Sequence, residues 1–130
     1  MGSSPFGTFN GVEPFAIFPT VGLHAVAGDQ VFLGRATYEP GTTVKRHSHE
    51  HTEQAMLIVE GSVDVTIGDE VRTLGPGDTC VVNRGIEHEL YSEGGMTFVE
   101  ALSPVLRDHV PDAERDLVLG EQGDSLHAER

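Results

Sequence analysis

The feature that most constrains the fold is a series of short β-prone runs separated by turn residues. Between Gly22 and Leu102 these runs are rich in Val, Ile, Thr, Phe and Tyr, and Gly, Pro and Asp stand between them. Apolar and polar residues alternate most clearly over Ser62–Ile67, and no stretch before residue 108 keeps a helical period. We therefore predict strands over Leu23–Ala27, Gln30–Tyr38, Thr43–His49, Gln54–Glu60, Ser62–Ile67, Val71–Leu74, Thr79–Val82, His88–Ser92 and Thr97–Leu102.

Many short strands at even spacing predict an all-β sandwich or barrel, with the jelly roll among the candidates. The 130 residues are enough for one domain and leave no room for a second full core. We expect an extended N-terminal arm over residues 1–21, a β domain over 22–107 and a polar, acidic, partly disordered tail over 108–130.

The arm contains more aromatic residues than a solvated tail would carry. Its phenylalanines are Phe6, Phe9, Phe15 and Phe18. Because a small barrel has little spare surface to cover them, we expect the arm to pack on a neighbouring subunit and form a homodimer.

Charge and cysteine content narrow the classes of partner. Eight Lys and Arg against 21 Asp and Glu give a net charge of −13, which disfavours nucleic acid and anionic membranes as partners. Cys80 is the only cysteine and lies in an apolar run, so we predict a buried thiol rather than a nucleophile. We see no transmembrane run and no signal peptide. A single cysteine allows no intramolecular disulfide, so we expect a cytoplasmic protein. We expect its partner to be a small molecule.

The residues that most clearly indicate a functional site are the clustered histidines His47, His49 and His51. If the strand runs through His49, then His47 and His49 project from one face, because side chains alternate with a period of two. Two adjacent imidazoles make a poor core, since each buried ring needs a polar partner, but they make a good pair of metal ligands.

The context of this cluster matches a known pattern. The chain reads Gly41-x5-His47-x-His49-x4-Gln54-x6-Gly61 and, further on, Gly77-x5-Asn83-x-Gly85-x2-His88-x3-Ser92. These segments resemble the two motifs of the cupin superfamily, G-x5-H-x-H-x(3,4)-E-x6-G and G-x5-P-x-G-x2-H-x3-N. The resemblance implies a cupin-type jelly-roll barrel and one divalent metal ion held by His47, His49, Gln54 and His88.

The departures from the motifs bear on function. Gln54, Asn83 and Ser92 stand where the family has Glu, Pro and Asn. Gly61 sets the register that places Gln54 in the pocket, since a slip of one residue would turn the side chain outward. Glu53 and His51 remain the alternatives for the fourth ligand.

A set of neutral ligands leaves a divalent ion its full charge, which favours Lewis-acid chemistry on a keto or enol substrate. Zn, Ni, Fe and Mn all suit mixed nitrogen and oxygen ligands, and the sequence does not choose among them. The chain resembles single-domain cupins of antibiotic biosynthesis that cyclise aromatic polyketides, and also cupins that ketonise unsaturated uronates. A cyclase or isomerase-type metalloenzyme is therefore our first hypothesis, with an Fe or Ni dioxygenase and a non-enzymatic binding or sensing protein as the alternatives.

The catalytic acid or base is not identifiable from the sequence. Tyr38, Arg35 and Glu100 are polar residues on apolar strands and are candidates to face the cavity. We expect the remaining histidines, which are His24, His109 and His127, to be structural or solvated.

Overall fold

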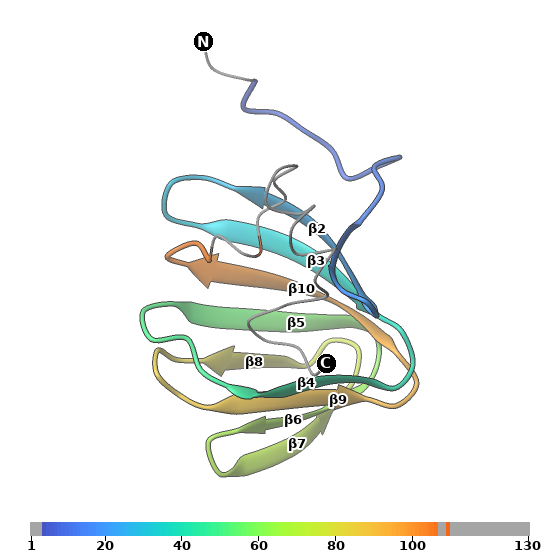
Figure 1. Ribbon diagram of the computed structural model, residues 1–130, viewed down its shortest axis with the longest axis vertical. Helices are drawn as coiled ribbons and strands as arrows, with labels where there is room; N and C mark the ends of the chain where they lie inside the picture. The colour runs from blue at the N-terminus through green and yellow to red at the C-terminus, as the bar shows by residue number, and fades with distance from the viewer. Residues whose placement is uncertain (1–3, 107–108, 110–130) are drawn as a thin grey trace.

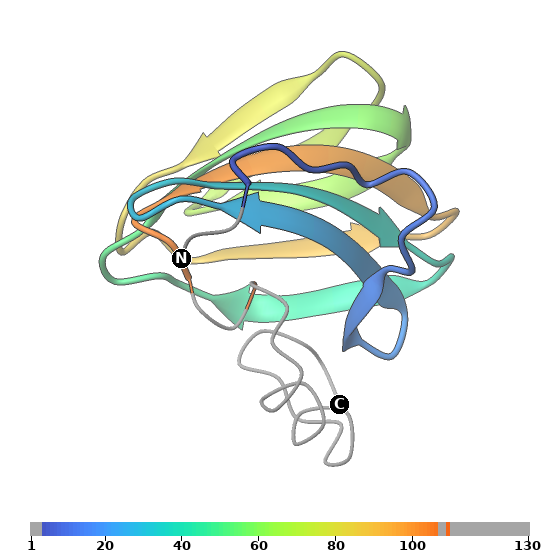
Figure 2. The same ribbon diagram turned by 90° about the horizontal axis from the view of Figure 1, so that it is seen from above.

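The computed structural model describes residues 4–106 and 109, and its strands form two antiparallel sheets that face each other (Figure 1 and Figure 2). The six-stranded sheet has the order β1-β2-β3-β10-β5-β8, and the four-stranded sheet has the order β4-β9-β6-β7. The strands are β1 (Phe15–Phe18), β2 (Val21–Ala27), β3 (Phe32–Tyr38), β4 (Thr42–His47), β5 (Glu53–Gly61), β6 (Val63–Ile67), β7 (Glu70–Leu74), β8 (Thr79–Val82), β9 (His88–Ser92) and β10 (Met96–Ser103). The all-β prediction is confirmed.

Every predicted strand is present, and β1 is one that the sequence analysis did not predict. Phe15–Phe18 was assigned to an extended arm, whereas it pairs antiparallel with β2. Ile17 and Phe18 are both buried, so this part of the expected arm belongs to the core of the domain. A four-residue strand with consecutive buried side chains lacks the alternation by which strands are recognised in a sequence. The expected tail over 108–130 lies, apart from His109, outside the described residues.

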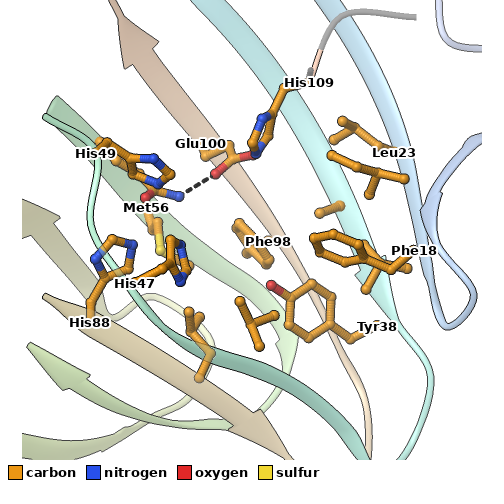
Figure 3. A pocket seen from close by; sticks show the side chains of 16 residues that line it. Phe18, Leu23, Tyr38, His47, His49, Met56, His88, Phe98, Glu100 and His109 are labelled. Carbon is orange, nitrogen blue, oxygen red and sulfur yellow. Dashed lines mark hydrogen bonds between the residues drawn. The ribbon is translucent and has the colours of Figure 1, made fainter. Parts of the chain in front are cut away.

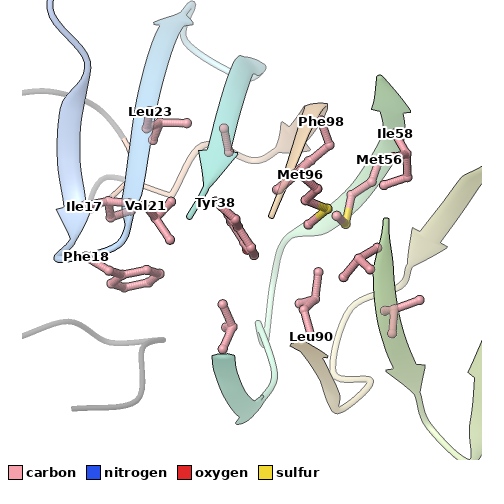
Figure 4. Packing of buried hydrophobic residues seen from close by; sticks show 14 of the residues in the cluster. Ile17, Phe18, Val21, Leu23, Tyr38, Met56, Ile58, Leu90, Met96 and Phe98 are labelled. Atoms are coloured by element: carbon pink, nitrogen blue, oxygen red, sulfur yellow. The ribbon is translucent and has the colours of Figure 1, made fainter. Parts of the chain in front are cut away.

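The interior is built from the alternate residues of each strand. Along β5 the side chains of Gln54, Met56 and Ile58 are buried while their neighbours are exposed. The apolar side chains of the two inner faces pack against each other between the sheets (Figure 4). Burying them provides the main stabilisation of such a sandwich, about 25 cal/mol per Å² of apolar surface removed from water.

The turn after β5 depends on a glycine. Gly61 has a φ of +79°, in the left-handed region that favours glycine. A Cβ at this position would collide with the carbonyl oxygen of Gly95, and Met96 Cα would lie 2.8 Å away. The close approach lies beside an irregularity in the β10–β5 pairing between Thr97 and Phe98.

The N-terminal phenylalanines have different environments, and most of them are covered by their own chain. Phe18 is buried, Phe15 packs against the core, and the Phe9 ring lies 5.4 Å from His24 and 5.3 Å below the Arg35 guanidinium. Phe6 is 87% exposed. Phe18 therefore needs no partner subunit to cover it, Phe6 remains uncovered, and the homodimer stays a prediction.

The outer face of the six-stranded sheet carries a different apolar feature. Register partners across five neighbouring strands form an uncharged line, which we call the outer apolar row. Its members are Val26, Leu33, Ala101, Ala55 and Val81. Val26, Leu33 and Val81 are each more than half exposed.

In the part of the chain that the structure describes, no helix has the length and apolar character needed to cross a membrane.

Candidate metal centre

Two of the predicted ligands lie opposite each other on neighbouring strands of the four-stranded sheet. His47 ends β4 and His88 begins β9, and the two are register partners. Their ring centroids lie 4.2 Å apart. The pairing of β4 with β9 is irregular between Val44 and His47, so this contact between distant parts of the sequence depends on a local departure from the regular ladder.

His49 reaches the same place from outside a strand. We predicted that the strand would continue to His49, but β4 ends at His47 and His49 lies in the connection to β5. The amide of Gly85 donates a 2.8 Å hydrogen bond to the carbonyl oxygen of His49 and holds this connection against the turn before β9. The His49 ring is buried and lies 4.9 Å from His47 and 5.1 Å from His88.

The nitrogens of His47, His49 and His88 that can act as ligands all lie within 4.8 Å of one another, so the three residues can hold a metal ion. His88 Nδ1 donates to the carbonyl oxygen of Ile86, and His47 Nδ1 donates to that of Lys45. Each bond assigns the proton to Nδ1 and the lone pair to Nε2, which is how metal-binding histidines are commonly oriented. Burial, with smaller contributions from His47 and Arg46, lowers the pKa of His88 to about 4, so its ring is neutral and able to ligate at pH 7.

Gln54 projects into the interior from β5 and is 8% exposed. Its Nε2 donates a hydrogen bond to Glu100 Oε1, drawn as the dashed line in Figure 3. Its Oε1 is buried and has no hydrogen-bond partner. An unpartnered buried acceptor is rare, and a cation held at the three histidines would satisfy it. This orphaned oxygen and the three histidine side chains fit a divalent metal ion.

The two alternatives for the fourth ligand face away from the cluster. Glu53 is exposed on β5, as the alternation with Gln54 requires. The side chain of His51 is 82% exposed, and its Nε2 lies 3.8 Å from Glu50 Oε1. Of the three candidates for the fourth ligand, Gln54 points toward the interior, whereas Glu53 and His51 are exposed.

The three histidines and Gln54 line a cavity of about 40 Å³ between the sheets. One water needs roughly 10–15 Å³ on the same measure, so there is space for an ion with a few waters or for one end of a substrate. Apolar side chains such as Phe18, Leu23 and Phe98 form the opposite side of the cavity (Figure 3).

Of the three polar candidates on apolar strands, Tyr38 and Glu100 line the cavity. Figure 3 shows the Tyr38 hydroxyl directed into it, and the ring packs edge-on against Phe98 with centroids 5.4 Å apart. Burial, together with the negative charge of Glu100, raises the pKa of Tyr38 well above its ordinary value, so the phenol stays protonated. Arg35 instead lies over Phe9, on the outer face of the sheet.

His109 is the site residue that sequence reasoning missed. It lines the cavity, packs edge-on against Phe32 at 5.9 Å, and points toward Glu100 in Figure 3. It follows the last strand and matches neither motif, so no signal in the sequence distinguishes it. Of the other residues we set aside, His24 donates to the Val12 carbonyl oxygen as a structural residue, and Cys80 is half-buried with its thiol pKa raised by burial.

Comparison with known proteins identifies the architecture. The family model described as "Cupin domain" matches residues 34–102, which include every strand that contributes to the histidine cluster. The chain belongs to the cupin family. The fold expectation of a cupin-type jelly roll is thereby confirmed.

Among solved structures, KdgF from Halomonas sp. superposes with a TM-score of 0.76 at 22% identity, covering 83% of this chain and 100% of that one. An RmlC-like cupin from Shewanella frigidimarina superposes with a TM-score of 0.77 at 20% identity, covering 83% of this chain and 97% of that one.

Curated relatives match the cupin over a shared segment only. The tetracenomycin polyketide synthase protein TcmJ of Streptomyces glaucescens is 32% identical over 73 residues, which are 55% of this chain and 48% of TcmJ. The xanthan biosynthesis protein XanB of Xanthomonas campestris is 31% identical over 69 residues, 53% of this chain and 15% of XanB. The chain thus spans about half of one relative's length and a small part of the other's.

Proposed function

We propose that this cupin is a metal-dependent enzyme that catalyses keto–enol chemistry and ring closure on a small molecule, as a polyketide cyclase does. The observation that carries the proposal is a donor set without a carboxylate: three histidines, two of them buried, and the buried, unpartnered oxygen of Gln54. The similarity to TcmJ, whose name places it in a polyketide synthase system, supports the substrate class. The cytoplasmic location remains part of the proposal.

A divalent ion bound by His47, His49, His88 and Gln54 would act as a Lewis acid that stabilises negative charge on a substrate carbonyl oxygen. The ligands are all neutral, so the full charge of the ion would be available to the substrate. Zn, Ni, Fe and Mn remain the candidates.

Tyr38 supplies a hydrogen-bond donor from the opposite side of the cavity. Its hydroxyl stays protonated and points into the space beside the histidines. In that position it can donate a hydrogen bond to a second substrate oxygen and orient a β-dicarbonyl unit. Glu100 provides a carboxylate in the same cavity, and the apolar residues around it exclude water from the reacting atoms.

The volume of the cavity limits what can enter. Ligand pockets that enclose a whole drug-sized molecule measure about 300–1,000 Å³. A cavity of about 40 Å³ instead receives the reacting carbonyl end of a substrate, and a longer poly-β-keto chain would extend through the mouth.

The test compares the protein loaded with each of the four metals. We expect the zinc form to accelerate hydrogen–deuterium exchange at the carbon between the carbonyls of a β-diketone, followed by NMR, without consuming oxygen. It should also increase the yield of cyclised product from a poly-β-keto thioester. Tyr38→Phe should retain the metal and slow the exchange.

Two outcomes would reject the cyclase proposal. Activity confined to the Fe or Ni form, with stoichiometric oxygen uptake, would identify a dioxygenase. A protein that binds metal and diketone but accelerates neither exchange nor ring closure would be a non-enzymatic binding cupin.

A further inference from the structure

Gln54 and Glu100 form a buried pair that lines the same cavity as the histidine cluster. In the antiparallel register Gln54 lies opposite Leu102 and Glu100 lies opposite Met56, so the two are diagonal neighbours on the inner face of β5 and β10. They are 8% and 4% exposed, and the Gln54 amide donates to the Glu100 carboxylate. We propose that Glu100 is a positioning residue that turns the Gln54 oxygen toward the metal and requires a neutral side chain at position 54. This inference rests on the proposed metal site.

The first part of the inference concerns the direction of the amide. Gln54 Nε2 donates to Glu100 Oε1, and this carboxyl oxygen can accept only from the NH₂ side of the amide, not from its oxygen. Turning the amide over would set its oxygen against the Glu100 carboxylate and remove the hydrogen bond. Because the NH₂ group faces Glu100, Gln54 Oε1 has no hydrogen-bond partner and is the atom that a cation can bind.

The second part concerns the chemical group at position 54. A glutamate there has no N–H to donate and would set two carboxyl groups in contact inside the protein, where either two like charges repel or one group must take up a proton. With glutamine the pair keeps its hydrogen bond and contains one acid. The contact with Glu100 therefore accounts for the amide that stands where the cupin motif has a glutamate.

The contact with Glu100 determines what Gln54→Glu should do. From the sequence alone, that substitution would supply an anionic ligand and tighten metal binding. In the structure the new carboxylate would face Glu100, so the single substitution is expected to destabilise the protein. Exchanging both residues, as Gln54→Glu/Glu100→Gln, restores the hydrogen bond, now donated by the amide at position 100, and keeps the total charge of the pair.

The experiment is a double-mutant cycle of the wild type, Gln54→Glu, Glu100→Gln and the double variant. Two quantities are measured for each: the melting temperature in the presence of a chelator, and the affinity for Zn²⁺ by competition with a coloured chelator. Glu60→Gln serves as the control, because it removes the same charge from an exposed position on β5.

We expect Gln54→Glu to lower the metal-free melting temperature by several degrees and the double variant to recover most of the loss. Glu100→Gln should weaken Zn²⁺ binding by about 10- to 100-fold, the usual effect of removing a group that orients a ligand. The double variant should bind Zn²⁺ at least as tightly as the wild type. The control should match the wild type in both measurements.

The inference is overturned if the two substitutions act additively on the metal-free melting temperature, or if Glu100→Gln binds Zn²⁺ as tightly as the wild type. A failure of the proposed metal site is distinguishable, since the wild type itself would then bind no ion. The metal-free measurements would still show whether Gln54 and Glu100 are coupled.

Discussion

Replacing His88 with alanine should abolish the stabilisation of this cupin by metal. His88 is 1% exposed and lies opposite His47, so its imidazole is the most enclosed of the three donors. Alanine removes the nitrogen ligand and leaves a space that neighbouring strands cannot fill without distorting the β4–β9 pairing. The remaining donors, which are His47, His49 and Gln54, would no longer surround the ion.

The magnitude for the wild type follows from binding linkage. A ligand at 100 times its dissociation constant stabilises the native state by about 2.7 kcal/mol. Unfolding entropy near 60 °C is about 2.1 cal/mol/K per residue, or roughly 0.2 kcal/mol/K for the roughly 100 residues that the structure describes. The melting temperature of the wild type should therefore rise by about 13 °C at this metal concentration.

The assay is thermal unfolding with a chelator and then with Zn²⁺ or Ni²⁺, together with metal analysis of the dialysed protein. His88→Ala should show no metal-dependent shift and contain no ion. His51→Ala, a substitution at an exposed histidine, should keep the full shift. Should His88→Ala fail to fold, His47→Ala provides the same comparison at a half-buried position. An unchanged shift and one bound ion in either ligand variant would refute the site.

Three further predictions concern the fold, the cavity and association. Gly61→Ala should lower the free energy of unfolding, measured in urea, by about 2–5 kcal/mol, because alanine is strained in a left-handed backbone and its Cβ would collide with Gly95. A loss below about 1 kcal/mol would contradict this contact. Tyr38→Phe should give the same tyrosinate absorbance as the wild type up to about pH 11, because the raised pKa keeps Tyr38 protonated there; a smaller absorbance would show that Tyr38 ionises. We propose that a homodimer forms through the outer apolar row, because three of its side chains are more than half exposed and the row adds no charge to the repulsion between two negatively charged copies. Leu33→Glu should sediment as a monomer at micromolar concentration, and a monomeric wild type would reject the dimer.

The strands could be predicted from the sequence because local chemistry determines them. Glycine and proline mark the turns, and alternation in runs such as Val63–Ile67 indicates which side chains face inward. The register set by Gly61 predicted Gln54 inward and Glu53 outward, and in the structure Gln54 is buried and Glu53 is exposed. The histidine cluster could be predicted because the spacing of its residues matches a family motif.

Features that depend on contacts between strands were not predictable in this way. His49 joins the cluster from a connection whose path is held by Gly85, a residue far along the chain. The sequence does not show that Glu100 lies diagonally from Gln54, because that placement depends on the register of β5 with β10. Arg35 and Tyr38 occupy opposite faces of β3, and only the packing of the second sheet shows which face encloses the cavity.

The proposed ligands do not all come from one sheet. His47 and His88 lie on β4 and β9 of the four-stranded sheet, whereas Gln54 lies on β5 of the six-stranded sheet. An ion shared among them would act as a cross-link between the two layers. Metal loading should then slow amide hydrogen exchange most strongly in β4 and β9, so that occupancy of the site governs how often the layers separate.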